Sequence, residues 1–417
     1  MTAWAPLLDG AARSRAVALA DAVAGALLAA PPTGGDVTPT WHGTLGAAVF
    51  LTAWGRFAGR ADCAAAGAAL LDAAVDAAAA QPPTVGLYGV PVGLAFAAAM
   101  LDPAGESDVD AFVANVVDRA SWPGAHEVLY GLAGTGAYCL ARLPRPPARR
   151  AVDAAVRHLA NAAREEPDGV TWAYAPPPGG AFAFNEYRPE GHVNLGFAHG
   201  VPGIVAFLAG AAEAGAPGAR ELLAPAVRWL LAQRRPPGAG SAFAGFVFPG
   251  QDAPPARLAW CYGDPGVAVA LLAAGRALGD GGVLDAAREV ARGCAGRAPE
   301  EAEGATLCHG SAGLGHLFNR LGQGLGDERL LDLARYWFDV TVTRDAAGLT
   351  VVDRAAVTAL LDAGATVTVD AGYGLLLGAA GAGLALLSAA TAEPPWWDGP
   401  LLVTPFAGSA GSAGSAG

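Results

Sequence analysis

The sequence predicts an all-α fold, an α/α toroid of seven helix pairs in which an inner ring of helices is surrounded by an outer ring. The first observation is a recurring phrase in which Gly and small residues lead into an apolar run, as in "FAHGVPGIVAFLAGA" and "CYGDPGVAVALLAAG". The second is that amphipathic segments lie between the copies. A phrase repeated at long intervals is typical of architectures in which each unit buries its apolar face against its neighbours.

The copies of the phrase predict the inner helices. Gly allows positive φ or close backbone approach at a tight turn, and we expect a second Gly in each copy to let neighbouring inner helices approach each other. If every copy begins a helix, all the helix starts face the same end of the ring, and their polar groups converge on one central cavity. The leading glycines of the seven copies are Gly43, Gly89, Gly131, Gly200, Gly263, Gly310 and Gly378.

Amphipathic segments between the copies predict the outer helices, because their apolar residues recur at three- and four-residue spacing. Such segments are residues 59–80, 149–165, 219–235, 283–297 and 327–342. Longer intervals predict loops or minor β-hairpin insertions, which often carry substrate contacts. These intervals are residues 165–196, the Pro- and Gly-rich residues 235–257, and residues 338–370 with the β-type runs "FDVTVTRDAAGLTVVD" and "TVTVD".

Composition favours one large core and excludes some partners. The 417-residue chain is 53% hydrophobic and 15% charged, so we expect a single toroid domain over residues 1–407. The "GSAGSAGSAG" tail, residues 408–417, has the composition of a flexible, engineered linker. A net charge of −12 argues against nucleic acid and anionic membrane surfaces. The uncharged stretch 371–392 is long enough to span a bilayer, but it contains the seventh copy and is better explained as a buried inner helix.

Five cysteines without a secretory signal predict reduced thiols in a cytoplasmic protein. Cys261, Cys308 and His309 form the sharpest candidate site, because each stands one or two residues before a leading Gly and should project from equivalent corners of adjacent units. Thiolates and an imidazole are preferred zinc ligands, and catalytic zinc keeps a fourth position open. The alternative is two buried cysteines that pack as small hydrophobic residues. We predict one zinc ion at this corner.

Further polar side chains occupy the same end of the predicted ring. His199 stands at the equivalent corner one unit earlier and could act as acid or base near neutral pH. Glu127 could orient His199 across the ring, or it could be a carboxylate at a helix start. Tyr262 and Arg257 flank Cys261: the Tyr could line the site or pack, and the Arg could stabilise an oxyanion or lie in solvent. His42 has the same local position several units away, and we expect it to pack.

Three stretches, "NLGFAHGVPG", "AWCYGDPG" and "LCHGSAGLGH", resemble the signature stretches of the LanC lanthionine synthetase cyclases, and the resemblance covers about residues 40–390. It implies that Cys261, Cys308 and His309 bind zinc, and that His199, Tyr262 and Arg257 line the active site. The family usually has an Asp where this chain has Glu127, so the longer side chain should reach the same place. The resemblance implies a stand-alone lanthipeptide cyclase acting on a dehydrated precursor peptide, with a separate dehydratase as a candidate partner.

The mechanistic hypothesis is a Michael-type addition. A cysteine thiol of the peptide enters the open zinc position, loses its proton, and attacks the β-carbon of a dehydroalanine or dehydrobutyrine. Arg257 would stabilise the enolate oxyanion. His199 would return a proton to the α-carbon, with Tyr262 as the alternative donor, and the product is a lanthionine or methyllanthionine ring.

Three alternatives stay open. Protein prenyltransferase β-subunits also combine a helical toroid with a zinc-bound thiol, but they use an Asp-Cys-His ligand set. A non-catalytic peptide-binding toroid would have structural zinc, closed by a fourth protein ligand. The eukaryotic relatives of the family are thought to add glutathione to dehydroamino acids, and this chain could do the same.

Overall fold

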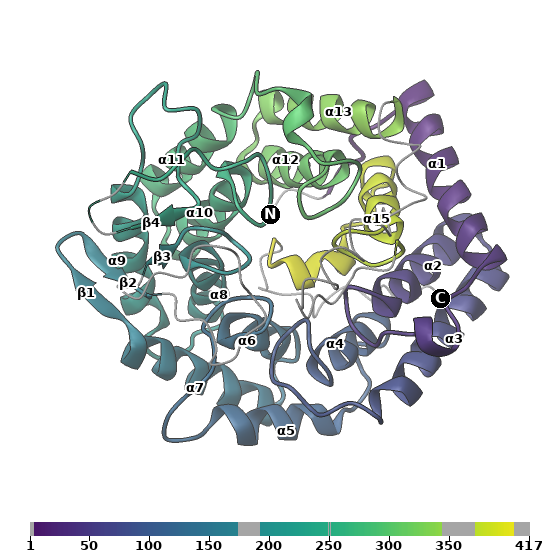
Figure 1. The fold of residues 1–417 in the computed structure, drawn as a ribbon, viewed down its shortest axis with the longest axis horizontal. Coiled ribbons are helices and arrows are strands. Elements are labelled where there is room, and N and C mark those ends of the chain that lie inside the picture. Colours follow the sequence, from purple (N-terminus) through teal and green to yellow (C-terminus); the bar gives the residue numbers. More distant parts are fainter. Residues whose placement is uncertain (1–3, 174–191, 249, 251, 344–371, 404–417) are drawn as a thin grey trace, which may run out of the picture.

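Two concentric rings of helices make up the protein (Figure 1). The structure is a computed structural model that describes residues 4–173, 192–248, 250, 252–343 and 372–403. The inner helices are α2 (Thr44–Ala58), α4 (Val92–Leu101), α6 (Leu132–Ala141), α8 (Val201–Glu213), α10 (Asp264–Leu278), α12 (Ser311–Leu325) and α15 (Ala379–Ala390). The outer helices are α1 (Gly10–Ala29), α3 (Ala61–Ala78), α5 (Asp108–Val117), α7 (Pro146–Ala162), α9 (Ala219–Ala232), α11 (Gly281–Arg292) and α13 (Glu328–Thr343). The predicted toroid of seven helix pairs is confirmed.

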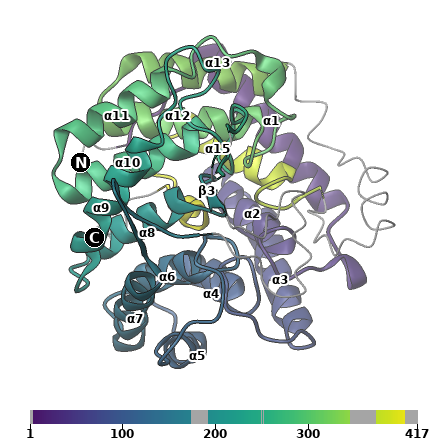
Figure 2. The ribbon, with the colours of Figure 1, turned by 60° about the vertical axis from the view of Figure 1, so that its left-hand side comes forward.

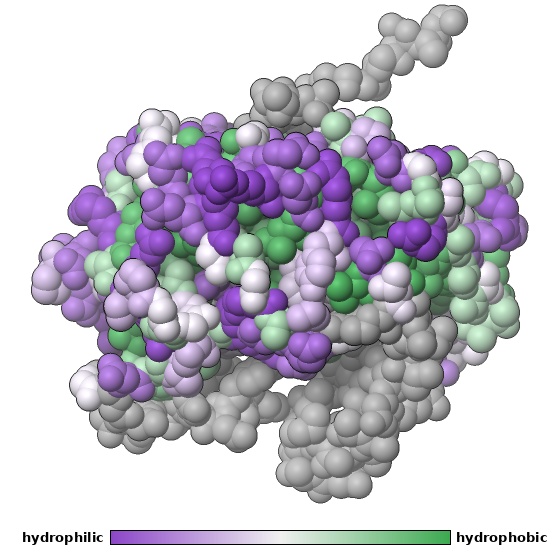
Figure 3. Space-filling view, turned by 90° about the horizontal axis from the view of Figure 1, so that it is seen from above, coloured by the Kyte–Doolittle hydropathy of each residue, from purple (hydrophilic) through white to green (hydrophobic). Residues whose placement is uncertain are grey.

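The inner helices begin directly after the recurring glycines. Gly263, for example, is the N-cap of α10, and only α4 begins later, at Val92. Every residue of α8 from Val201 to Ala211 is buried, as expected for a helix that is covered on all sides. The outer helices are amphipathic instead. Seen from above Figure 1, where α11 and α13 lie, hydrophilic side chains dominate the surface and apolar ones fill the recesses between them (Figure 3).

The ring closes between the two ends of the chain. Each of the inner helices from α2 to α12 packs against the outer helix that follows it in sequence, whereas α15 packs against the N-terminal helix α1. The turned view shows the same layering, with α11 and α13 outside α10 and α12 (Figure 2). The backbone N–H groups of Leu7 and Leu8 donate to the carbonyl of Ala389 at 2.8 and 2.9 Å, which fastens the N-terminal segment to the end of α15. Helices α1 and α5 were not identified from the sequence.

The turns that lead into neighbouring inner helices are joined by a belt of backbone hydrogen bonds with N···O distances between 2.8 and 3.3 Å. These bonds run from Leu375 to Trp41, Tyr88 to Leu129, Val128 to Ala198, Ala198 to Cys261, Trp260 to Cys308, and Cys308 to Leu376. A bond between turns fixes the height of one turn relative to the next. In the turns that these bonds join, the side chains just before the leading Gly are therefore held at similar heights.

The second Gly of most phrases has its closest neighbour within its own unit. A Cβ on Gly266 would collide with the carbonyl of Trp260, six residues earlier in the same turn, and Gly313 stands in the same relation to Leu307. The turn thus folds back onto the first turn of its own helix, and the close approach is within one unit. The expectation that the second Gly lets neighbouring units approach each other therefore does not describe the closest contact at Gly266 and Gly313, but it does at Gly46, where a Cβ would collide with the backbone of Leu375 in the neighbouring unit.

The strands are few and short. An antiparallel hairpin pairs β1 (Arg164–Glu166) with β2 (Gly169–Thr171), and β3 (Val193–Asn194) pairs with β4 (Phe246–Val247). The strand expected from Phe338 is wrong for residues 338–343, which form the end of α13. Trp337, Phe338 and Thr341 are buried there at helical spacing, so packing overrides β propensity. Residues 174–191, residues 344–370 and the tail 408–417 lie outside the described residues.

A C-terminal turn, η4 (Trp396–Leu401), lies inside the inner ring and follows α15 in yellow in Figure 1. The Tyr88 hydroxyl donates to the carbonyl of Pro400 at 3.3 Å, and the Trp260 indole donates to that of Leu401 at 3.2 Å. These two donors belong to turns on opposite sides of the ring, so η4 is held from both sides. In the described part of the chain, no helix combines the length and the apolar character that a bilayer crossing needs.

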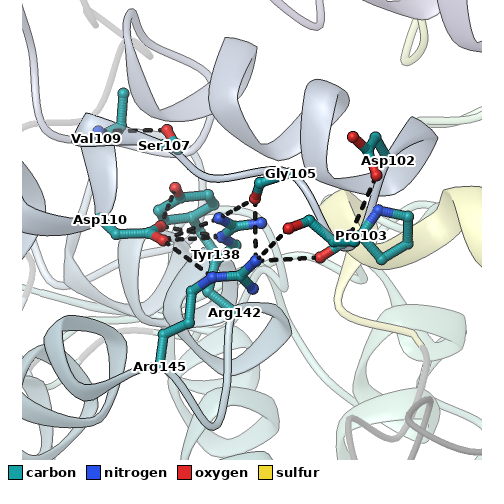
Figure 4. A network of polar contacts seen from close by, with 10 residues as sticks. Asp102, Pro103, Gly105, Ser107, Val109, Asp110, Tyr138, Arg142 and Arg145 are labelled. Atoms are coloured by element: carbon teal, nitrogen blue, oxygen red, sulfur yellow. Dashed lines mark hydrogen bonds and ion pairs between the residues drawn. The ribbon is translucent and has the colours of Figure 1, made fainter.

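A buried ion pair ties the outer layer to the inner layer at α5 and α6 (Figure 4). The Asp110 carboxylate accepts hydrogen bonds from the Tyr138 hydroxyl at 2.5 Å and from Arg142 Nε at 3.0 Å. Arg142 also donates from Nη2 to the carbonyl of Gly105 at 2.8 Å, which fixes the loop before α5. Both side chains of the Arg142–Asp110 pair are buried, so the network fixes α5 against the end of α6.

Candidate active site and metal centre

Cys261, Cys308 and His309 meet at one end of the ring. Each offers a ligand atom, and these atoms all lie within 4.8 Å of one another. The backbone N–H of Trp260 donates to the carbonyl of Cys308 at 2.9 Å, so the belt brings the two turns together. Both cysteines are buried, and the side chain of His309 is 18% exposed.

The chemistry of this cluster fits a zinc ion. Two sulfur ligands and one imidazole around a tetrahedral ion with Zn–S bonds of about 2.3 Å would stand within about 4 Å of one another, close to the observed spread. The Nδ1 atom of His309 is buried without a hydrogen-bond partner among the described residues, which is costly unless a ligand satisfies it. Within the described part of the chain, no fourth His, Cys, Asp or Glu joins the cluster. The cluster of two cysteines and one histidine also differs from the Asp-Cys-His ligand set of the prenyltransferase alternative.

The electrostatics around Cys261 favour its thiolate. The hydrogen bond from Cys308 is the largest influence and lowers the pKa of Cys261 well below its usual value, despite burial, with His309 and Arg257 contributing. The Arg257 guanidinium donates from Nη2 to the sulfur of Cys261 at 3.3 Å and from Nη1 to Glu303 at 2.9 Å. Arg257 therefore lies against the cluster of Cys261, Cys308 and His309 and touches one of its sulfur atoms.

His199 and Glu127 form a pair beside this cluster. Glu127 Oε2 lies 2.7 Å from Nδ1 of His199 and also accepts the backbone N–H of Leu129 at 3.0 Å, while Oε1 accepts that of Tyr130 at 2.6 Å. Glu127 is buried, and the His199 side chain is 12% exposed. An imidazole held at Nδ1 by a carboxylate has a defined orientation and exchanges its proton at Nε2.

Tyr262 stands between the cluster and the β3–β4 strand pair. Its hydroxyl receives a hydrogen bond of 2.9 Å from the side-chain amide of Asn194. Its ring lies 6.1 Å from that of His199 and 5.4 Å from that of Phe246, measured between centroids. The structure thus brings Tyr262 and His199 side by side.

The sequence profile of the lanthionine synthetase C-like protein family matches residues 40–402. The chain belongs to this family. Among solved structures, nisin cyclase aligns with 93% of this chain and 96% of its own, with a TM-score of 0.69 and 18% sequence identity. At this identity the likeness concerns the fold. No curated protein matches the chain in sequence.

Two contacts in this lanthionine synthetase C-like protein were not predicted from its sequence. His42 Nε2 lies 3.2 Å from the hydroxyl of Tyr130, and burial, reinforced by His199, lowers the pKa of His42 to about 4. His42 is therefore a neutral, hydrogen-bonded imidazole at neutral pH. The contact between Asn194 and Tyr262 was missed as well, although Asn194 begins the quoted stretch "NLGFAHGVPG". Neither contact has a local signal, because each joins residues far apart in sequence.

Proposed function

We propose that this protein is a zinc-dependent lanthipeptide cyclase that adds cysteine thiols to dehydroalanine or dehydrobutyrine within one precursor peptide. The observation that carries the proposal is the cluster of Cys261, Cys308 and His309 beside the Glu127–His199 pair. Family membership and the fold shared with nisin cyclase support it. The products would be lanthionine or methyllanthionine thioether rings.

Cys261, Cys308 and His309 would hold the zinc ion, and Arg257 would help to keep Cys261 ionised as a ligand. When bound, zinc lowers the pKa of a coordinating thiol and so favours the nucleophilic thiolate. Arg257 donates hydrogen bonds to Cys261 and Glu303. It would therefore stabilise the enolate oxyanion from a position next to the cluster. This second role of Arg257 stays a prediction.

The reaction needs one proton removed and one proton added. A bond forms between the thiol sulfur and the β-carbon, the π electrons move to the carbonyl oxygen, and the α-carbon then takes a proton. His199 can hold a proton at Nε2 between these events, because Glu127 keeps Nδ1 oriented. Tyr262, beside His199, is the second candidate donor to the α-carbon.

The test compares two buried cysteines. Cys308→Ala should lose zinc and slow ring formation by at least about 100-fold. Cys294→Ala is the matched control, since Cys294 is buried outside the cluster and its thiol donates to the carbonyl of Val290 at 3.5 Å. The measurements are zinc content and loss of free thiol from a synthetic dehydrated peptide. Zinc-free Cys308→Ala protein that cyclises at the wild-type rate would remove the proposal.

The same assay separates the cyclase from a glutathione transferase. A dehydrated peptide without cysteine is incubated with free glutathione, and a second peptide carries its own cysteine. We expect thioether formation within the second peptide and little glutathione adduct on the first. A glutathione adduct on the first peptide, with no thioether formed within the second, would contradict the cyclase proposal and favour glutathione addition.

A further inference from the structure

The side-chain amide of Asn194 has an unambiguous orientation. Its Oδ1 accepts the backbone N–H of Gly196 at 2.8 Å, and its other terminal atom lies 2.9 Å from the Tyr262 hydroxyl. A backbone N–H can only donate, so the atom facing Gly196 is the oxygen. The atom facing Tyr262 is therefore the NH₂ group, which has no acceptor capacity.

The donor at Asn194 determines how the Tyr262 hydroxyl is used. A phenol oxygen that receives a hydrogen bond from an amide must send its own hydrogen in another direction. The ring packs against those of Phe246 and His199, which fixes the place of the phenol oxygen. The hydroxyl hydrogen of Tyr262 is thus directed away from Asn194.

Asn194 is itself firmly held. It is 3% exposed, and it pairs with Phe246 in the antiparallel β3–β4 register. The next residue, Leu195, donates its N–H to the carbonyl of Gly245 at 2.9 Å. On the other side, a Cβ at Gly200 would collide with the carbonyl of Asn194, so the turn before α8 packs directly on this backbone. A side chain this constrained can impose a direction on its partner.

We propose that Asn194 is a positioning residue that directs the hydroxyl hydrogen of Tyr262 toward the reacting peptide. This inference rests on the proposed cyclase function and deepens it, because it prepares Tyr262 as a hydrogen-bond donor to the enolate or as the proton donor to its α-carbon. The β3–β4 pair is then a support for the active site. Its short strands bring Asn194 and Phe246 to the same phenol ring.

The decisive variant is Asn194→Asp, which has nearly the same shape. The new carboxylate keeps an acceptor for Gly196 but replaces the donor at Tyr262 by a second acceptor, which takes the hydroxyl hydrogen for itself. We expect kcat for ring formation to fall about tenfold or more, with KM for the peptide nearly unchanged. Zinc content and thermal unfolding check that the variant is folded.

A double-mutant cycle distinguishes positioning from a structural effect. If Asn194 acts through Tyr262, Asn194→Asp should change kcat by no more than about twofold when Tyr262→Phe is already present. An equal loss in both backgrounds would overturn the inference.

The pH dependence supplies a second readout. When the carboxyl introduced by Asn194→Asp is protonated it can donate again, so the ratio of the variant kcat to the wild-type kcat should rise as pH falls through the titration of that carboxyl. A ratio independent of pH would also overturn the inference. If the wild-type protein forms no ring in a dehydrated peptide, the proposed function fails, whereas an active wild type without coupling between Asn194 and Tyr262 leaves that function intact.

Discussion

Two carboxylate–imidazole pairs in this ring of helices have nearly the same oxygen–nitrogen distance and different surroundings. Glu127 Oε2 lies 2.7 Å from Nδ1 of His199, and Asp398 Oδ2 lies 2.8 Å from Nε2 of His316. The first pair joins two turns at the end of the ring where Cys261, Cys308 and His309 meet. The second joins α12 to the C-terminal turn η4 inside the ring.

The second pair is fully buried and has a cation as a third partner, and the first pair is less buried. Arg320 Nε donates to the same Asp398 oxygen at 2.7 Å, so a permanent cation matches the carboxylate. His316 is 1% exposed with the Trp397 ring 4.7 Å away, and burial lowers its pKa despite the opposing effect of Asp398. The His199 side chain keeps 12% exposure. The pair of Asp398 and His316, with Arg320, thus forms a buried contact that we call the latch, whereas the Glu127–His199 pair leaves part of its imidazole exposed, as the proposed proton transfer requires.

The largest difference between the two pairs should appear when each histidine is replaced by Ala. His199→Ala should lower kcat for ring formation by about 10²–10⁴-fold with little change in thermal stability, because Glu127 keeps its two backbone donors. His316→Ala should lower stability and leave the activity of the folded protein intact. The measurements are single-turnover thiol loss and thermal unfolding. Comparable activity losses in both variants would contradict the distinction.

Removing the Asp398 carboxylate from the latch should have the next largest effect, a loss of folding stability. Asp398→Ala leaves Arg320 and His316 buried without their common partner, and we expect the free energy of unfolding to fall by about 3–5 kcal/mol. Denaturant unfolding of the zinc-loaded protein measures it. Asp398→Asn is the control, because an amide can still accept from one partner, and its loss should be smaller. A change below about 1 kcal/mol for Asp398→Ala would argue against a latch.

Acid should weaken the protein through its buried imidazoles. Burial lowers the pKa of His316, and it lowers the pKa of His42 to about 4. Below about pH 6.5 the unfolded chain binds protons that the folded chain does not, so stability is full above that pH and is lost as pH falls toward the folded-state pKa. For His42 the loss is on the order of 3 kcal/mol. Unfolding of wild type and His42→Gln between neutral and acidic pH measures it, and equal slopes would contradict the prediction.

The smallest effect is expected for the contact between η4 and the turn that carries Cys261. It tests whether η4 influences the proposed zinc site. Trp260→Phe keeps an aromatic ring beside Cys261 but removes the indole hydrogen bond to the carbonyl of Leu401 in η4. We expect a loss of about 1–2 kcal/mol in unfolding free energy and zinc affinity within about tenfold of wild type. A competition titration with a chelator measures the affinity. A much larger loss of zinc binding would show that η4 positions Cys261, and the two regions would then act as one.

Much of the fold follows from local pattern. The leading glycines and the apolar runs after them predict where the inner helices begin, because tight turns and helical faces depend on residues close in sequence. The same register predicts that Cys261, Cys308 and His309 meet, since equivalent corners of adjacent units are neighbours. Residues 338–342 are the instructive case, because the sequence carries two conflicting signals there, the amphipathic pattern of 327–342 and the β-type residues from Phe338, and burial against the ring decides for the helix.

The sequence by itself therefore determined the repeated unit, the seven inner helix starts and the corner at which a metal could bind. Only the tertiary structure decided that α1 closes the ring against α15, that Arg257 lies on Cys261, that Asn194 aims at Tyr262, and that Asp398 latches His316. The physical reason is range. A turn or a helical face is specified by residues a few positions apart, whereas a hydrogen bond between distant side chains exists only after packing has made their turns neighbours.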